Sequence, residues 1–415
     1  DEIVVTGISS ANTLLTPADP ASTSLIVGLI ATLQSGSVQS GQTIRGFESI
    51  RIEDVRQVTI PGNSELNVGA HELQIDSQFA VNLSGQTSIN GGTLSSTSQL
   101  AMGPGETLTG HGTVAARVVS PSGSTITASG GDLTLGNPNS TSSIDIAGQL
   151  NTGGNNVTLV DGDAANVRGS IDLGNGNSAP GTITAMNGLS VQSGAQVTGH
   201  GSLVTGDGEA SSLFNNGDLV GTSSQSPLTV SGGLRGSGSI NNVLLEGNWN
   251  PAGTVINRLD GQVEFGSNAS LQVDIGGTST GVNHDRFRFN PGVTLGGSLE
   301  VNLTNGFSPS AGHQFEIISG ISSLSGSLDP ANLDLPDLVD GLKWNVNQSA
   351  TALTLQVILD AAALSDDVRI EVGTGNQIIV RGANDQPIPI AGSVLTLDVN
   401  PTQKFVPADN QQWAV

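Results

Sequence analysis

Residues 108–114 read Leu-Thr-Gly-His-Gly-Thr-Val, and residues 197–203 repeat this stretch as Val-Thr-Gly-His-Gly-Ser-Leu. A looser copy, Leu-Arg-Gly-Ser-Gly-Ser-Ile, occupies 234–240. We expect the glycines of this motif to allow the sharp turns that a coiled β-structure makes between its faces, because glycine reaches positive φ without a steric penalty. The motif therefore favours a fold built from stacked, repeated coils.

A second motif extends the repeat upstream. Leu-Asn-Val-Gly at 66–69 returns as Leu-Asn-Thr-Gly at 150–153, in the same order relative to the longer motif. This order predicts a duplication in which 66–114 matches 150–203. Each coil of a stacked repeat buries its apolar row against its neighbours, so a duplication extends such a fold without redesigning it.

Short alternations of apolar and polar residues fill the chain from about 50 to 359, as in Leu133-Thr134-Leu135 and Leu271-Gln272-Val273-Asp274-Ile275. Period two places alternate side chains on opposite faces of a strand. Frequent turns between short strands fit a sandwich, a barrel or a solenoid, and the internal repeats favour the solenoid. We expect an all-β fold, a right-handed parallel β-helix (β-solenoid) over 46–327.

The composition supports a thin core of aliphatic side chains. Aromatic residues make up 3% of the 415 residues, tyrosine is absent, and 57 residues are glycine. A globular core of this size normally uses many aromatic side chains, since each buries a large area. Val, Leu and Ile carry the apolar content here, which suits stacked strands.

The charge excludes some partners and favours an extracellular location. The net charge is -23, and Lys343 and Lys404 are the only lysines. Nucleic-acid binding needs a basic surface, so we expect no nucleic-acid partner.

The longest apolar run, 25–31, is far shorter than the roughly 20 residues of a membrane span. The absence of cysteine fits a secreted bacterial protein that does not rely on disulfides, and the acidity would keep it soluble in a salty medium.

Both ends of the chain differ from the repeats. Residues 1–45 are expected to supply a strand and a capping segment, including a short helix over 20–33 with Asp19 as its cap. Residues 328–360 are expected to form terminal rungs and a loop. Residues 361–415 hold three strand candidates and are too few to bury a good core alone, so we expect a small C-terminal β module.

An open solenoid exposes unpaired backbone donors and acceptors at its ends. If one end adds to another copy, the head-to-tail contact produces an open polymer. We therefore expect self-association through the following residues of the two ends: Ile3, Val4, Val5, Val368, Ile370, Val372, Ile378, Ile379, Val380, Phe405 and Trp413.

Several stretches resemble autotransporter-type passenger domains and related bacterial surface repeats. Gly-Gly-Leu-Arg-Gly-Ser-Gly-Ser-Ile at 232–240 leads to Gly-Asn-Trp-Asn-Pro-Ala-Gly at 247–253, and the stretches 269–301 and 306–318 are similar to the last coils of such passengers. The resemblance covers roughly 60–320. It implies a β-solenoid, export and mostly structural or adhesive work. Residues after 360 do not resemble the membrane-inserted part of such proteins, so we expect release, non-covalent attachment or assembly with further copies.

The sequence offers little for catalysis. Cysteine is absent, and no Gly-x-Ser-x-Gly lies on a strand-to-helix turn. His111 and His200 occupy equivalent repeat positions, which indicates a structural place in the turn. A glycosidase or lyase needs a pair of acids or an acid beside a base, whereas the acids here are scattered.

Calcium is the one cofactor for which the sequence offers ligands. Asp161 and Asp163 flank a glycine, as do Asp207 and Glu209. These four side chains could bind calcium weakly through their oxygens, although each pair is also explained as a turn held by its own side chain. No calcium-binding repeat is present.

The expected function is that of an extracellular structural protein that self-assembles into a fibre, sheath or surface coat. The first alternative is an adhesin that binds a surface glycan along a solenoid face. The second alternative is a carbohydrate-active β-helix enzyme.

Overall fold

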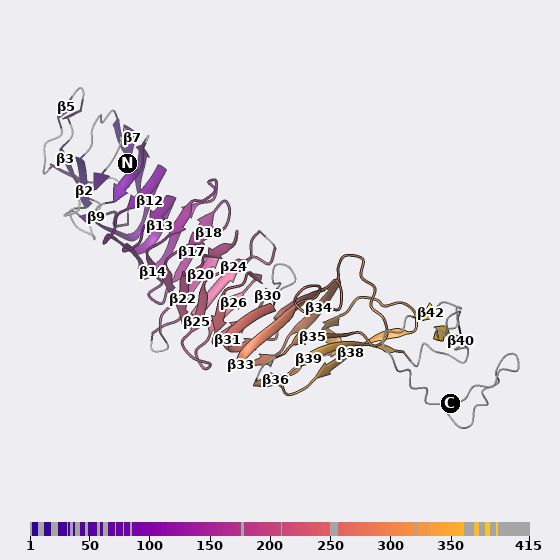
Figure 1. Ribbon diagram of the computed structural model, residues 1–415. Coiled ribbons are helices and arrows are strands. Elements are labelled where there is room, and N and C mark those ends of the chain that lie inside the picture. The colour runs from indigo at the N-terminus through magenta and orange to yellow at the C-terminus, as the bar shows by residue number, and fades with distance from the viewer. Residues whose placement is uncertain are drawn as a thin grey trace, which may run out of the picture. The chain divides into compact units, whose positions relative to one another are not determined.

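A computed structural model describes the chain from 68 to 360, apart from gaps at 71, 78, 84, 176–177, 209, 250–255, 320–321 and 329, together with strands of both end segments (Figure 1). Within 256–262 and 290–291 only the backbone is described. The chain divides into two compact units. The first comprises 1–307, 315–336 and 346–355, and the second comprises 308–314, 337–345 and 356–415.

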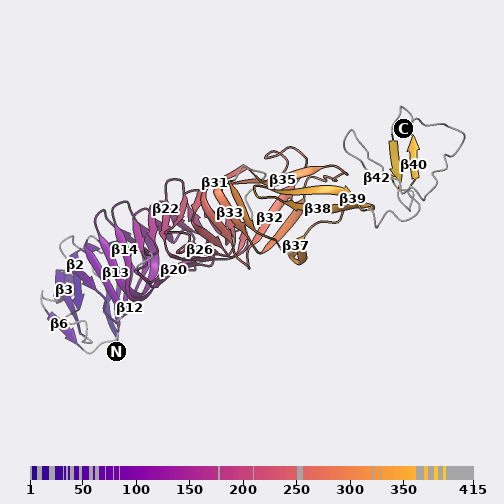
Figure 2. The ribbon, with the colours of Figure 1, turned by 90° about the horizontal axis from the view of Figure 1, so that it is seen from below.

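The first unit is a parallel β-solenoid, which confirms the expected fold class (Figure 2). Its strands stack in three series, here called faces 1, 2 and 3. Three long strands turn from one face into the next: β12 (Gln86–Met102), β13 (Thr107–Ser120) and β14 (Thr125–Asn137).

The remaining strands of face 1 are β9 (Glu65–Asn67), β16 (Gln149–Asn151), β19 (Ser170–Asp172), β22 (Gln196–Gly199), β25 (Asp218–Gly221) and β28 (Ser239–Asn241). Those of face 2 are β1 (Glu2–Thr6), β7 (Ser49–Val55), β10 (Glu72–Ser77), β17 (Asn156–Asp161), β20 (Gly181–Ala185), β23 (Gly201–Thr205), β26 (Leu228–Ser231), β29 (Val243–Leu245), β31 (Ile256–Phe265), β33 (Arg286–Leu295) and β36 (Ser323–Gly326). Those of face 3 are β8 (Thr59–Ile60), β11 (Val81–Leu83), β15 (Ile144–Ile146), β18 (Ala165–Val167), β21 (Leu189–Val191), β24 (Leu213–Asn215), β27 (Leu234–Arg235), β30 (Asn248–Trp249), β32 (Ser270–Ile275), β34 (Ser298–Leu303) and β37 (Leu333–Asp334). Strand β35 (Gln314–Ile318) pairs with β33, and the 3-10 helix η1 (Pro330–Asn332) precedes β37.

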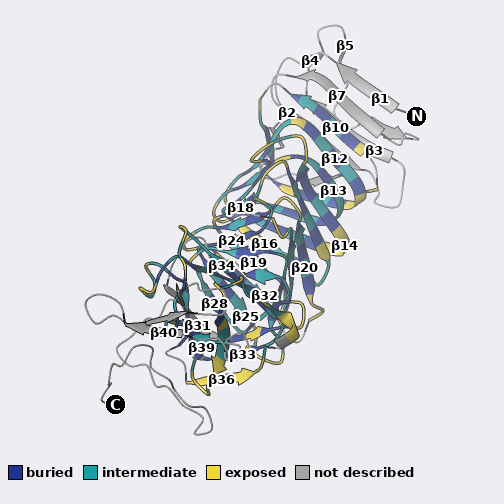
Figure 3. Ribbon diagram, turned by 90° about the vertical axis from the view of Figure 1, so that its right-hand side faces the viewer, coloured by how far each residue is buried: buried dark blue, intermediate teal, exposed yellow. Residues whose placement is uncertain are grey.

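Inward-facing residues form apolar columns that run from strand to strand. On face 1 the register aligns Leu108, Ile126, Leu150, Ile171 and Val197, and all five are buried. Burial of a Leu, Ile or Val side chain contributes roughly 1.5–3 kcal/mol. The alternation of buried and half-buried residues that the sequence predicted is visible along the strands in Figure 3.

Four glycines of the repeated motif, including Gly236, adopt the expected positive φ, whereas Gly201 and Gly238 do not. Gly110 and Gly112 have φ of 122° and 118°, and Gly199 has φ of 119°. A Cβ on Gly110 would lie 1.7 Å from the carbonyl oxygen of Ile89 in the preceding coil. A side chain is therefore excluded at Gly110 both by the backbone angle and by the close approach of the neighbouring coil.

The buried aromatic side chains of the described coils gather in the last coils of the solenoid. Trp249 packs against Phe265, Phe287 and Phe289, with ring centroids 4.8–5.9 Å apart. All four side chains are buried. Aromatic rings fill more volume than aliphatic side chains, so this cluster fills the core of the last coils with few side chains.

The N-terminal segment contains strands where the sequence predicted a helix. Strands β2 (Asn12–Pro17), β3 (Ser24–Ile30) and β6 (Gln42–Arg45) form an antiparallel sheet, and β4 (Thr32–Leu33) pairs with β5 (Gly36–Ser37). The expected helix over 20–33 is wrong. Ile26 and Val27 are β-branched and Gly28 weakens a helix, so the segment favours a strand once a partner strand is available. Strand β2 contacts β8 and β9 at the first coil.

The second unit holds a small antiparallel sheet. Strands β40 (Arg369–Val372), β41 (Ile378–Arg381) and β42 (Pro387–Ile388) pair in sequence order. Its other segments are joined by backbone hydrogen bonds, from Val357 N to His313 O and from Asp360 N to Gly341 O. Strands β38 (Leu342–Gln348) and β39 (Leu353–Leu359) each contribute residues to both units.

The motifs that suggested a duplication occupy matching places in their coils. Leu66 and Leu150 lie on face 1, as do Leu108 and Val197, two coils further on. The duplication and the domain boundaries stay predictions. Among the described residues, no helix has the length and apolarity needed to cross a membrane.

Candidate binding surfaces and assembly strands

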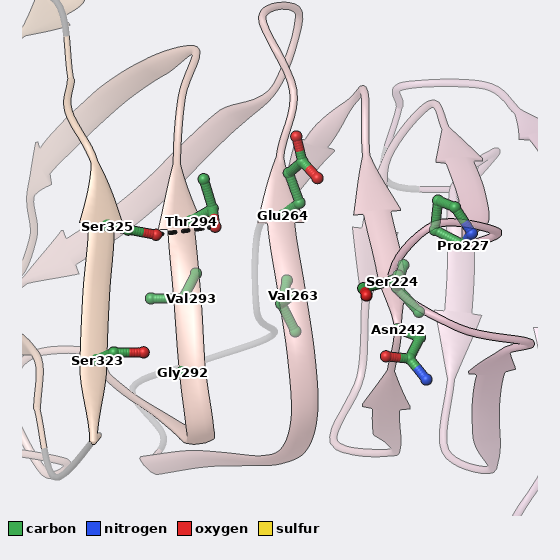
Figure 4. Close-up of a pocket in the computed structure, with 11 residues that line it drawn as sticks. Ser224, Pro227, Asn242, Val263, Glu264, Gly292, Val293, Thr294, Ser323 and Ser325 are labelled. Carbon is green, nitrogen blue, oxygen red and sulfur yellow. Dashed lines mark hydrogen bonds between the residues drawn. The ribbon is translucent and has the colours of Figure 1, made fainter.

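A hollow of about 100 Å³ opens on the outer surface of face 2, near the C-terminal end of the solenoid (Figure 4). Its walls come from β29, β31, β33 and β36 and from the turn before β26. The lining residues are Ser224, Pro227, Asn242, Val243, Val263, Glu264, Gly292, Val293, Thr294, Ser323 and Ser325. Below, this feature is called the face 2 hollow.

The parallel register brings the polar side chains of the hollow together. Glu264 pairs with Thr294, and Thr294 pairs with Ser325, so the three residues stand on adjacent strands (Figure 4). The Oγ atoms of Thr294 and Ser325 share a hydrogen bond of 3.0 Å. Among the described residues no hydrogen bond or ion pair engages the Glu264 carboxylate, so this exposed acceptor is available to a ligand.

Gly292 forms part of the floor of the hollow. It aligns with Ser323 of β36, and a Cβ at this position would lie 2.4 Å from the Ser323 Oγ atom. The Ser323 side chain and backbone therefore already occupy the space beside Gly292, and a larger residue at this position would displace them. Asn242 closes the opposite side, where its backbone has a positive φ of 53° and its side-chain nitrogen donates to Gly221 O.

A second, larger groove follows the turns between faces 3 and 1. It has a volume of about 480 Å³, and its lining residues are Ser122, Gly123, Ser124, Thr125, Ala147, Gly148, Gln149, Arg168, Gly169, Ser170, Gly194 and Gln196. Arg168 donates to both carboxylate oxygens of Asp145, at 2.9 Å from Nε and 2.5 Å from Nη2. The hydrogen bond with Asp145 raises the pKa of Arg168. This cation is already matched by a carboxylate, so the groove offers an outside anion little charge.

Asp161 and Asp163, two of the expected calcium ligands, hold backbone N–H groups. Asp161 is buried, and its Oδ1 and Oδ2 accept from Ser143 N (3.0 Å) and Ile144 N (2.8 Å). Asp163 Oδ1 accepts from Ser142 N at 2.7 Å. Both carboxylates thus stabilise the turn of the preceding coil, and within their own turn Asp163 N donates to Asp161 Oδ1 at 3.4 Å.

Asp207 is exposed after β23, which is two strands along the stack from the β17 strand of Asp161. Glu209 lies outside the described residues. The described part of the chain contains no group of three His, Asp or Glu side chains that could hold a metal. Calcium binding stays a prediction.

His284 is a buried polar group that the sequence did not single out for a role. Its Nδ1 donates to Gly277 O at 3.2 Å, its ring meets the Phe315 ring edge-on at 5.4 Å, and its Nε2 has no partner. Burial lowers its pKa, and the nearby Arg286 adds to this effect, whereas the Gly277 carbonyl and Glu316 oppose it.

The expected assembly residues of the N-terminus lie in β1. The register pairs Ile3, Val4 and Val5 with Ile50, Arg51 and Ile52 of β7. Because β7 pairs with β10 on its other side, β1 is the outermost strand of face 2. Among the described strands, β1 pairs with β7 and with no second strand.

Some of the expected assembly residues of the C-terminus lie in the described β40–β41 pair, and the others lie outside the described residues. Ile370 pairs with Val380, and Val372 pairs with Ile378, in the antiparallel β40–β41 pair, where Glu371 faces Ile379. Val368, Phe405 and Trp413 lie outside the described residues.

The face 2 hollow was not predictable from the sequence. The residues Asn242, Glu264, Thr294 and Ser325 come from four segments, and no local motif connects them. The one available signal was Glu264 within the alternation Val263-Glu264-Phe265, which places a carboxylate on the outer surface of a strand. The chain matches no protein-family model and no curated protein.

Proposed function

We propose that this chain is an extracellular structural protein that self-assembles into a fibre, sheath or surface coat through its non-repeating ends. The position of β1 as the outermost strand of face 2 carries the proposal. An outermost strand presents a row of unpaired N–H and C=O groups, and a strand from another copy can complete the sheet there.

The C-terminal sheet is the proposed partner of that edge. Strands β40, β41 and β42 form a three-stranded sheet whose outer strands have free edges among the described residues. A contact between different surfaces of two copies is heterologous and repeats without closing, so it produces a filament. The resemblance of 60–320 to bacterial surface passengers supports an extracellular location.

The test is electron microscopy and sedimentation of the purified full-length chain beside a chain lacking 361–415. We expect the full-length chain to elongate at high concentration and the shortened chain to stay monomeric. Far-UV circular dichroism serves as the control, because both chains should retain the solenoid. If the shortened chain polymerises as well, the C-terminal role is wrong.

Experiments on the same two proteins distinguish self-assembly from the two alternative functions. An adhesin would stay monomeric at high concentration and bind a surface saturably. A carbohydrate-active enzyme would release reducing ends from a polysaccharide.

A further inference from the structure

We propose that the face 2 hollow binds a neutral glycan, with one sugar residue seated between Asn242, Glu264 and Thr294. This site is independent of the chain ends and of the proposed self-assembly. It would give a structural subunit a means of attaching to a polysaccharide surface.

The polar groups of the hollow match the hydroxyls of a sugar. A carboxylate only accepts hydrogen bonds, whereas a hydroxyl or an amide both donates and accepts. Glu264 can therefore receive two sugar hydroxyls, while Thr294, Ser325 and Asn242 offer donors and acceptors around it. The volume corresponds to roughly three water molecules, so the hollow admits the hydroxyl-bearing edge of one sugar ring, whose hydroxyls can replace such waters while keeping their hydrogen bonds.

Apolar surface beside these groups suits the C–H side of a sugar ring. Pro227 lines the hollow, and Leu244 lies between Glu264 and Thr229 in the outward column of face 2, where it is half-buried. Binding sites typically combine an apolar wall with a few converging polar groups. Pro227 supplies apolar lining within the hollow, and Leu244 extends the apolar surface beside Glu264, in the absence of an aromatic platform.

The outward column offers places for further sugar residues. From Glu264 toward the N-terminus the register continues through Leu244, Thr229, Ser202 and Thr182, each on the next strand. Adjacent strands are about 4.8 Å apart, so an extended oligosaccharide lying along the stack would meet a new hydroxyl side chain at nearly every strand.

Charge selects a neutral ligand over an acidic one. The chain has a net charge of -23, and Glu264 adds a local negative charge with no described partner. A uronic acid or sulfated sugar would bring a second anion beside that carboxylate, and like charges at short range repel.

The test is saturation-transfer NMR and calorimetry of the full-length chain with maltohexaose, cellohexaose, laminarihexaose and mannohexaose, and with hexagalacturonate as the acidic probe. We expect at least one neutral oligosaccharide to bind and hexagalacturonate not to bind. Absence of binding by all four neutral probes overturns the proposal, and so does a preference for hexagalacturonate.

Single substitutions test whether the glycan binds at the face 2 hollow. Glu264→Gln and Thr294→Val preserve side-chain size. Glu264→Gln should raise Kd about tenfold or more, because hydrogen bonds to a charged acceptor are lost, and Thr294→Val should raise Kd by roughly two- to tenfold, because a neutral hydrogen bond is lost. Asp207→Asn and Thr158→Val are matched controls, since both residues are solvent-accessible and lie away from the hollow. Unchanged binding in Glu264→Gln and Thr294→Val, or equal losses in the controls, overturns the assignment. Circular dichroism verifies that every variant is folded.

Discussion

A single buried carboxylate in this solenoid supports the turn of a neighbouring coil. Asp161 is 2% exposed and accepts from two backbone N–H groups of the coil before it. A sequence pattern cannot distinguish this use from calcium binding, since both need a carboxylate in a polar turn. The distinction depends on which backbone groups the preceding coil presents to the carboxylate.

Replacement of Asp161 by alanine tests the structural use. We expect Asp161→Ala to lower the free energy of unfolding by roughly 2 kcal/mol or more, because two buried N–H groups lose their acceptor. Urea denaturation followed by circular dichroism measures the change. Asp163→Ala should cost less, since its carboxylate is exposed. If added calcium stabilises the wild type but not Asp161→Ala, the residue binds the ion.

His284 links the stability of the solenoid to pH. Burial favours the neutral imidazole in the folded state, so its pKa lies below the value of about 6.5 in the unfolded chain. The neutral form is compatible with an unpartnered Nε2, whereas a protonated ring would bury an N–H without an acceptor. The stability contribution is therefore complete above pH 6.5 and is lost as pH falls through 6.5 toward the folded-state pKa.

Replacement by phenylalanine removes this titration. We expect His284→Phe to lose less stability than the wild type between pH 7.5 and pH 5, by up to about 1.4 kcal/mol per unit of pKa difference. Urea midpoints at each pH provide the measurement, and the Arg286–Glu316 ion pair (2.6 Å) is retained in both proteins. Parallel losses in the two proteins would exclude a contribution from His284.

The strands were the most predictable elements. Alternation such as Leu133-Thr134-Leu135 gave strands at the expected places, with Leu133 and Leu135 buried and Thr134 facing outward. The segment 20–33 was not predictable in the same way. Its Asp-Pro start is typical of a helix, but pairing of β3 with β2 and β6 supplies backbone hydrogen bonds that outweigh a local preference.

The face 2 hollow is a property of strand register. Glu264, Thr294 and Ser325 are 30 and 31 residues apart in sequence, yet they become neighbours because β31, β33 and β36 pair in parallel. Face 1 illustrates why such pairs are hard to predict. The spacing between aligned residues varies from 18 (Leu108 to Ile126) to 26 (Ile171 to Val197).

At the scale of the whole molecule, the net charge of -23 opposes contact between copies. The range of this repulsion falls from about 30 Å at 0.01 M ionic strength to about 10 Å at 0.1 M. We therefore expect self-assembly of the full-length chain to increase with sodium chloride, as measured by light scattering at constant pH. The chain lacking 361–415 should show no such increase. Assembly that weakens with salt would indicate that ion pairs, rather than strand addition, join the copies.

The sequence by itself determined the type of fold. Period-two alternation defines strands locally, and glycine at positions such as Gly110 is required wherever a coil turns tightly against its neighbour, so both signals are present in the linear order of residues. Only the tertiary structure decided which side chains meet across coils. Asp161 became a support for a turn and Glu264 the wall of a hollow because stacking joins residues whose separation depends on the lengths of the intervening turns.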